Sequence, residues 1–282
     1  MAHRAQAAGP VIHLRSVSLG RVPDERGFPF TVPAVRAMET LELRAPVTFF
    51  VGENGSGKST LLEGIALAAA LPAVGSEDAR DDRTLQAQRR LARHFRLSWG
   101  RRTHRGFFLR AEDFFGFTRR LARTREEMRA RLVEVDEEFR GASAYVRGLA
   151  AGPARASLAE MERRYGEDLD ASSHGESFLK LFAARFVPDG LYLLDEPEAP
   201  LSPSSQLTLL AMMGEMLGRG AQFIIATHSP ILLAFPGADI WTFDRTPITR
   251  VAYDDLEHVS LTRSFLQDPG GYLRRMGVEG GE

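Results

Sequence analysis

One run of small and polar residues near the start of the chain has the spacing of a phosphate-binding loop. Residues 52–59 satisfy the pattern G-x-x-x-x-G-K-[ST]. Glycines let the backbone curl until successive N–H groups point at phosphate oxygens, and the N-terminus of a following helix adds partial positive charge. Lys58 can reach the β- and γ-phosphates, and the Ser59 hydroxyl can coordinate Mg²⁺. The pattern therefore predicts a P-loop that binds ATP with Mg²⁺ as cofactor. The residues that we expect to contact ATP are Asn54, Gly55, Ser56, Gly57, Lys58, Ser59 and Thr60.

Two adjacent carboxylates, Asp195 and Glu196, follow the apolar run Leu191–Leu194. At the C-terminal end of a strand in a doubly wound sheet, such side chains face the ligand crevice. We expect Asp195 to hold Mg²⁺ through water and Glu196 to polarise the attacking water as a general base. The alternative is a pair of helix-capping acids.

A histidine ends the next apolar run. His228 comes directly after residues 222–227, which are rich in isoleucine and phenylalanine. A lone histidine is more often structural than catalytic, but at a strand end beside two carboxylates it can contact a γ-phosphate. Lys58, Glu196 and His228 are therefore the predicted catalytic residues.

The elements that must position these side chains follow from hydrophobic periodicity. Residues 47–51, 191–194 and 222–227 are short buried runs typical of core strands, and residues 11–19 and 38–43 alternate like half-buried strands. A short strand is predicted at 107–110. Helices are predicted over 61–67, 83–95 and 178–186, and over most of 114–165, where Gly148, Gly152 and Pro153 are expected to break the run. On that last segment Met128, Leu132, Val135 and Phe139 share one helix face.

Composition sets further bounds. The 282 residues suit one large α/β domain or two small ones, and with no cysteine the chain has no disulfide, thiolate metal site or cysteine nucleophile. The longest apolar run, Ile65–Leu71, stops at Pro72 and is too short to span a membrane. No secretory signal is evident in the first ten residues. We therefore expect no membrane insertion and a cytoplasmic location.

Arginines are concentrated in one part of the chain. Twelve lie between Arg89 and Arg125, against only two acids, Glu112 and Asp113. One interpretation is a surface for DNA or an acidic protein partner, and the other is a solvated helical face balanced by acids folded nearby. The net charge of −1 predicts no global attraction to nucleic acid.

An aromatic residue upstream of the P-loop could stack on the adenine ring. Phe28 and Phe30 are the two candidates, and core packing is the alternative for both.

These motifs, with one more, resemble those of the ABC-class ATPases. Residues 172–177 precede the apolar stretch Phe178–Phe186 and occupy the place of the family's signature loop. Ser173, Gly175 and Glu176 match the usual Ser, second Gly and Gln, whereas His174 departs from the usual first Gly. Residues 195–203 look like the carboxylate motif and dimer-contact loop of the non-transporter SMC, RecF and OLD-like branch, with Ser202 where transporter ATPases have Asp. The resemblance covers about residues 11–245.

The resemblance implies an α/β fold of the ABC type. Its parts would be a mainly parallel core sheet, an N-terminal antiparallel β portion and an inserted helical lobe. We expect a single ATPase domain over 1–282, with the lobe at 75–172 and a C-terminal extension at 246–282. No glutamine follows the strand where the family carries its γ-phosphate-sensing loop, and Glu112 is the nearest counterpart and a further candidate metal contact.

The resemblance also implies an ATPase cycle. Two protomers would sandwich ATP head to tail, with the P-loop of one facing the signature loop of the other (Ser173, His174, Gly175 and Glu176), and hydrolysis would separate them. Coupling to DNA repair or defence is the first expectation for the process served. A transporter ATPase subunit and a nucleotide-gated regulator of a protein partner are the alternatives.

Overall fold

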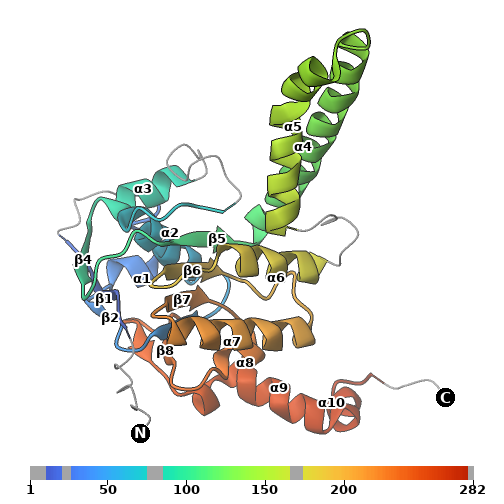
Figure 1. Ribbon diagram of the computed structural model, residues 1–282. Helices are drawn as coiled ribbons and strands as arrows, with labels where there is room; N and C mark the ends of the chain where they lie inside the picture. The colour runs from blue at the N-terminus through green and yellow to red at the C-terminus, as the bar shows by residue number, and fades with distance from the viewer. Residues whose placement is uncertain (1–10, 21–26, 75–84, 166–173, 279–282) are drawn as a thin grey trace, which may run out of the picture.

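A six-stranded sheet lies at the centre of the fold (Figure 1). The computed structural model describes residues 11–20, 27–74, 85–165 and 174–278. The strand order is β5-β6-β7-β3-β8-β9, with the first five strands parallel and β9 antiparallel to β8. Their bounds are β3 Val47–Val51, β5 Gly106–Arg110, β6 Leu191–Asp195, β7 Gln222–Ala226, β8 Asp239–Thr242 and β9 Thr249–Arg250. The mainly parallel core sheet expected from the sequence is confirmed.

Helices cover both faces of this sheet, which is why its strands are apolar throughout. On one face Phe50 and Ile224 pack with α2 (Lys58–Ala68), the helix that follows the P-loop. On the other face Phe49 and Ile225 pack with two longer helices. These are α6 His174–Arg185 and α7 Pro203–Gly218, with the short α8 Pro230–Leu233 beside them. Residues in alternate positions of each strand thus serve two cores.

A second, antiparallel sheet has the order β2-β1-β4. Its strands are β1 Leu14–Leu19, β2 Leu41–Glu42 and β4 Phe95–Trp99, and the four-residue helix α1 (Pro33–Arg36) lies between β1 and β2 in the chain. The expected N-terminal antiparallel portion is therefore present.

The helix predicted over 83–95 is partly wrong. Within the described residues a helix, α3, spans only Gln86–Ala92, and Phe95 begins β4. Phe95, Leu97 and Trp99 alternate with polar residues and pack against the core around α2. That alternation is a strand signal hidden inside a polar stretch.

Two long helices project from the sheets as an arm (Figure 1). They are α4 (Ala111–Glu138) and α5 (Ala144–Tyr165), and α4 alone is about 40 Å long. The predicted break at Gly148, Gly152 and Pro153 is wrong, because α5 continues through all three and the chain turns at 139–143 instead. Packing of α5 along α4 outweighs their weak helix propensity. The described part of segment 75–172 therefore also contains α3 and two strands, β4 and β5, that belong to the sheets.

The arm is not basic, which corrects the expectation of an arginine-rich lobe. Of the twelve arginines only four lie on α4, namely Arg119, Arg120, Arg123 and Arg125. Over its whole length α4 has six arginines and eight acids, and α5 has four arginines and two acids, so their charges cancel. The remaining eight lie on α3 (Arg89, Arg90), in β4 and β5 (Arg96, Arg110) and in the adjoining connections (Arg93, Arg101, Arg102, Arg105). Arg101 pairs with Asp189, and Arg110 is buried. Sequence proximity had grouped side chains that the fold separates.

Residues 246–278 add β9 and two helices, α9 (Glu257–Gln267) and α10 (Pro269–Arg275). They run along the underside of α7 and away from the sheets (Figure 1). Within the part of the chain that the structure describes, no helix combines the length and apolar character needed to cross a bilayer.

Gly106 should tolerate no side chain. Its φ of +110° favours glycine, and a Cβ would lie 1.9 Å from the Leu191 carbonyl oxygen in the neighbouring strand. We expect Gly106→Ala to lower the free energy of unfolding by about 3 kcal/mol or more, measured by urea denaturation. Gly148→Ala is the control, because Gly148 has open space around it inside α5 and should gain about 0.5–1 kcal/mol. Equal effects of the two changes would contradict this account.

Candidate nucleotide-binding site

The P-loop connects β3 to α2 through a backbone that only glycine adopts easily. Gly52, Gly55 and Gly57 have φ angles of +147°, +83° and +103°. A Cβ on Gly57 would lie 2.6 Å from Val32 Cγ1, so the segment before α1 closes over the loop. All the residues predicted to contact ATP lie on this loop or in the first turn of α2.

Lys58 is held inside the loop. Its ammonium donates to the carbonyl oxygens of Gly52, at 2.5 Å, and Glu53, at 3.0 Å. Burial lowers the pKa of Lys58, and the carboxylates of Glu196 and Asp195 oppose that shift. The cation can exchange these two carbonyl oxygens for phosphate oxygens without leaving the loop.

The structure brings together the two predicted magnesium contacts. Ser59 Oγ donates to Asp195 Oδ1 at 3.1 Å, although β7 lies between the strands that lead to them. Burial raises the pKa of Asp195 to about 7, against the opposing hydrogen bond from Ser59. A hydroxyl and one carboxylate suit Mg²⁺, which takes few protein ligands and completes its shell with phosphates and water. Among the described residues no cluster of three or more histidines or carboxylates could hold a metal.

Glu196, the residue after Asp195, has a backbone conformation that is unusual for a residue other than glycine. Its φ is +50°, and its N–H donates to Ala226 O of β7 at 2.9 Å. Left-handed backbone at a non-glycine residue carries strain, which persists only where the surroundings hold it. The exposed side chain lines a cavity of about 550 Å³ beside the P-loop. The lining residues are Glu53, Asn54, Glu196, Glu198, Ala199 and His228.

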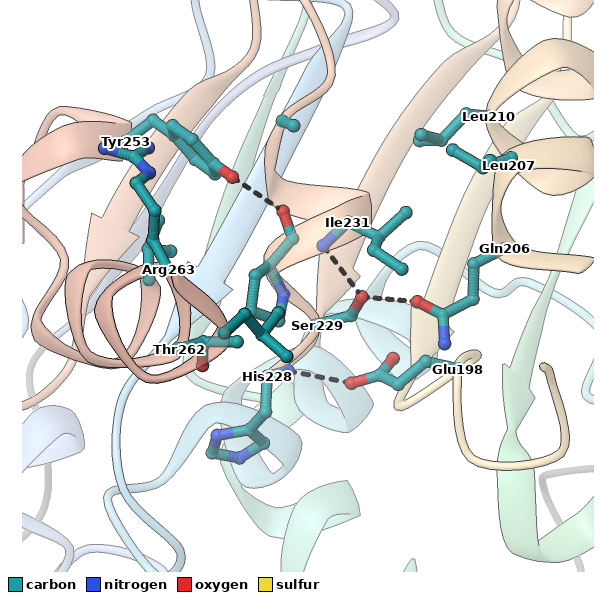
Figure 2. Close-up of a pocket in the computed structure, with 14 residues that line it drawn as sticks. Glu198, Gln206, Leu207, Leu210, His228, Ser229, Ile231, Tyr253, Thr262 and Arg263 are labelled. Carbon is teal, nitrogen blue, oxygen red and sulfur yellow. Dashed lines mark hydrogen bonds between the residues drawn. The ribbon is translucent and has the colours of Figure 1, made fainter. Parts of the chain in front are cut away.

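His228 reaches the same cavity from the end of β7. Its backbone N–H donates to Glu198 Oε1 at 2.8 Å, while its ring is turned away from that carboxylate (Figure 2). The ring Nε2 is buried and has no hydrogen-bond partner in the described structure. Burial first, and then the Lys58 charge, lowers the pKa of His228, so the ring is neutral at pH 7. An unpartnered ring nitrogen at this cavity suits a hydrogen bond to a phosphate oxygen.

Sequence reasoning missed three residues at this site. Asp244 follows β8, and its Oδ1 accepts a hydrogen bond from the Glu53 N–H of the P-loop at 2.6 Å. Glu198 accepts a hydrogen bond from the His228 backbone N–H. His258 of α9 interacts electrostatically with both His228 and Asp244. Asp244 carries the same signal as Asp195, an acid just after an apolar strand, and could have been found. Nothing in the local sequence marks His258.

The remaining predicted residues are more dispersed. Glu112 lies in the first turn of α4 with 74% of its side chain exposed and pairs with Arg110. Arg110 itself lies opposite Asp195 in the β5–β6 register and bonds to Glu63 of α2.

The signature loop is only partly visible. Ser173 lies outside the described residues, and of His174 only the backbone, at the start of α6, is described. Gly175 packs closely against Pro200 and Ser205 of the same chain, whereas Glu176 is exposed.

The two candidate adenine-stacking residues differ in their exposure to solvent. Phe30 is 4% exposed and meets His94 edge to face, with ring centroids 5.5 Å apart, so it belongs to the core. Phe28 is 49% exposed and is the candidate that remains.

Two family profiles match parts of the chain. A family profile described as "AAA domain, putative AbiEii toxin, Type IV TA system" matches residues 119–234, and one described as "AAA domain" matches residues 34–96. No curated protein matches the sequence.

Solved structures resemble the chain over most of its length. An ATP-binding subunit of an ABC transporter is 17% identical over 96% of both chains, with a TM-score of 0.40. The Smc head domain from Pyrococcus furiosus, solved bound to the C-terminal domain of ScpA, is 12% identical over 91% of this chain and 99% of that one, with a TM-score of 0.43. CbiO1 from Clostridium perfringens, part of the ABC transporter complex cbiONQ, is 16% identical over 93% and 99%, with a TM-score of 0.45.

Asp195 should destabilise the protein when no ligand is bound. Its carboxyl loses a proton at its ordinary pKa in the unfolded chain but only near pH 7 in the folded one, so stability falls as the pH rises between these values. We expect Asp195→Asn to raise the free energy of unfolding at pH 8 by about 1–3 kcal/mol, and the gain to shrink toward pH 5. Urea denaturation in magnesium-free buffer at both pH values tests this, and a gain independent of pH would contradict it.

Proposed function

We propose that the chain is a P-loop ATPase of the ABC class, which binds MgATP, hydrolyses it, and dimerises head to tail in doing so. The hydrogen bond between Ser59 and Asp195, beside the cavity shared by Glu196 and His228, carries the proposal. It joins a phosphate-binding loop to a strand-end carboxylate at the position where a triphosphate would end. The P-loop alone would support binding, and the two further side chains at the cavity support hydrolysis.

Each residue then has one task. Lys58 moves from the Gly52 and Glu53 carbonyl oxygens to the β- and γ-phosphates. Ser59 and Asp195 hold Mg²⁺, which neutralises charge on the phosphate oxygens when bound. Glu196 takes a proton from the attacking water, and its exposure at the cavity leaves room for that water.

His228 is proposed to hold the γ-phosphate. Its neutral ring can donate from Nε2, the atom that has no partner in the described structure. Glu198 positions this histidine through the backbone rather than through the ring. The hydrogen bond therefore leaves the ring nitrogens available to the nucleotide.

The proposed dimerisation rests on the position of the signature-loop residue Gly175 at the start of α6. Gly175 packs on the 199–202 loop, so the signature helix and the loop after Glu196 form one surface beside the cavity. A partner's P-loop phosphate is the ligand that the family resemblance assigns to this surface.

The arm favours a regulator of a protein partner over a DNA-coupled enzyme. Coupling to DNA was expected from a basic lobe, and the charges of α4 and α5 cancel. Instead, the far end of the arm exposes Val133, Tyr145 and Leu149 at 60%, 77% and 63%. Grouped apolar side chains on a surface are typical of protein contacts. No described residue argues for a transporter subunit.

ATP turnover is the first test. Lys58→Ala should abolish hydrolysis and nearly all binding of MgATP. Glu196→Gln should keep binding and lower kcat by roughly 10²–10⁴-fold, the usual contribution of a general base. Phosphate release and fluorescent-nucleotide titration measure the two quantities. Glu137→Gln, at an exposed position on α4, is a matched control that should leave binding and turnover unchanged. A Glu196→Gln enzyme with wild-type turnover would remove Glu196 from its role.

Adding ATP should increase the average molecular mass of the Glu196→Gln variant in solution. We expect Glu196→Gln to associate when ATP is added, because it closes on ATP and cannot hydrolyse it. Light scattering at micromolar protein, with and without ATP, measures this change. An unchanged mass would count against the sandwich, and adding Lys58→Ala to the variant should remove any increase.

A further inference from the structure

A second polar contact joins the P-loop helix to the strand ends beside the one between Ser59 and Asp195. Ser59 and Glu63 are one helical turn apart on α2 and therefore share one face of it. Arg110 and Asp195 are Cα partners at the ends of β5 and β6. Their side chains face α2, because the residues two positions earlier in each strand belong to the core cluster around that helix. Ser59 bonds to Asp195 at 3.1 Å, and Arg110 Nη1 donates to Glu63 Oε1 at 3.3 Å.

Glu63 is a buried carboxylate beside the predicted magnesium contacts. Its side chain is 8% exposed, and both Arg110 and Gln88 of α3 hydrogen-bond to it. Burial raises the pKa of Glu63, and the Arg110 charge opposes that rise, so the guanidinium favours the ionised form. Burial also raises the pKa of Asp195, and the charge of Glu63 adds to that rise. A carboxylate that disfavours a second negative charge at Asp195 favours a cation there for the same electrostatic reason.

Arg110 also bonds to the base of the arm. Its Nε donates to Asp113 Oδ2 at 2.7 Å and its Nη2 to Asp113 Oδ1 at 3.0 Å, and the Asp113 side chain is 16% exposed. Asp113 lies in the first turn of α4. Because the guanidinium is planar and rigid, a two-point contact with Asp113 fixes the direction in which Nη1 meets Glu63. The first turn of the arm therefore sets how Arg110 holds Glu63.

We propose that Glu63 is a positioning residue of the magnesium site, and that Arg110 and Asp113 set the orientation of its carboxylate. The inference rests on the proposed function, because it concerns the cation that accompanies ATP. Glu63 does not replace Ser59 or Asp195 as a metal contact. Its fixed negative charge beside them strengthens binding of the cation, as carboxylates around the ligands of a metal do.

The Mg²⁺ dependence of nucleotide binding tests this role of Glu63 without any turnover. A fluorescent, non-hydrolysable ATP analogue is bound to the full chain while Mg²⁺ is varied, and the Mg²⁺ concentration at half-maximal binding is measured. Glu63→Gln keeps the size of the side chain and its capacity for hydrogen bonds but removes the charge. It should raise the half-maximal Mg²⁺ concentration about 10-fold or more. A residue with a purely structural role would lower the free energy of unfolding and leave this concentration unchanged.

A second variant tests whether the arm acts through Glu63. Asp113→Asn weakens the hold of the arm on Arg110, so the guanidinium turns toward Glu63 and neutralises more of its charge. The half-maximal Mg²⁺ concentration should rise about 3-fold. The double variant should match Glu63→Gln alone, because Asp113 acts through Glu63, whereas independent effects would multiply. Glu127→Gln is the matched control, because it removes an arm carboxylate that pairs with an exposed arginine, and it should change nothing.

Ser59→Ala separates failure of this inference from failure of the proposed function. If Ser59→Ala raises the Mg²⁺ requirement and Glu63→Gln does not, the magnesium site stands and the role of Glu63 is overturned. A wild-type chain that binds no nucleotide in the presence of Mg²⁺ overturns the proposed function and this inference with it. Circular dichroism identifies a variant that does not fold. Should Glu63→Gln fail in that way, an unchanged Mg²⁺ requirement in Asp113→Asn overturns the inference.

Discussion

The hydrogen bond between Ser59 and Asp195 is the contact on which the site depends. Its two residues are far apart in the sequence, and they meet because β3, β7 and β6 are parallel neighbours whose carboxyl ends share one edge of the sheet. The same edge carries Glu196, His228 and Asp244, each at or just after the end of a strand. A change in strand order would leave every motif intact in the sequence and disperse the site.

The residues at this edge of the sheet lower the stability of the ligand-free protein. Asp195 is buried with its pKa raised, Glu196 has a left-handed backbone, and the His228 ring nitrogen is buried without a partner in the described structure. Each feature is unfavourable in the free protein. A cation would relieve the buried Asp195 carboxylate, and a phosphate oxygen would give the His228 ring nitrogen a partner. The strongly apolar core strands, with fully buried Phe49, Tyr192 and Phe223, supply the stability that allows it.

The two parts that project from the sheets differ in how they are attached. The arm begins directly after β5, where the buried Arg110 bonds both to Glu63 on the P-loop helix and to Asp113 at the base of α4. The C-terminal helix α9 approaches the site from the other side, where it carries His258 and lines an apolar groove together with His228. Movement of the arm would therefore affect residues that contact the P-loop helix, and movement of α9 would affect residues that line the cavity.

The sequence by itself determined the site motifs and the core strands. The P-loop, the paired carboxylates and the strand-end histidine were identifiable because phosphate binding and buried parallel strands restrict residue types at fixed spacing. Tertiary structure decided what depends on long-range placement. The twelve arginines are divided among α3, the sheets, the connections between them and the arm. Pro153 lies inside α5 and Phe95–Trp99 forms a strand, because packing outweighed local propensity at both points. Asp244, Glu198 and His258 joined the site for the same reason: their role is set by which strand ends and helices become neighbours, and local sequence does not encode that.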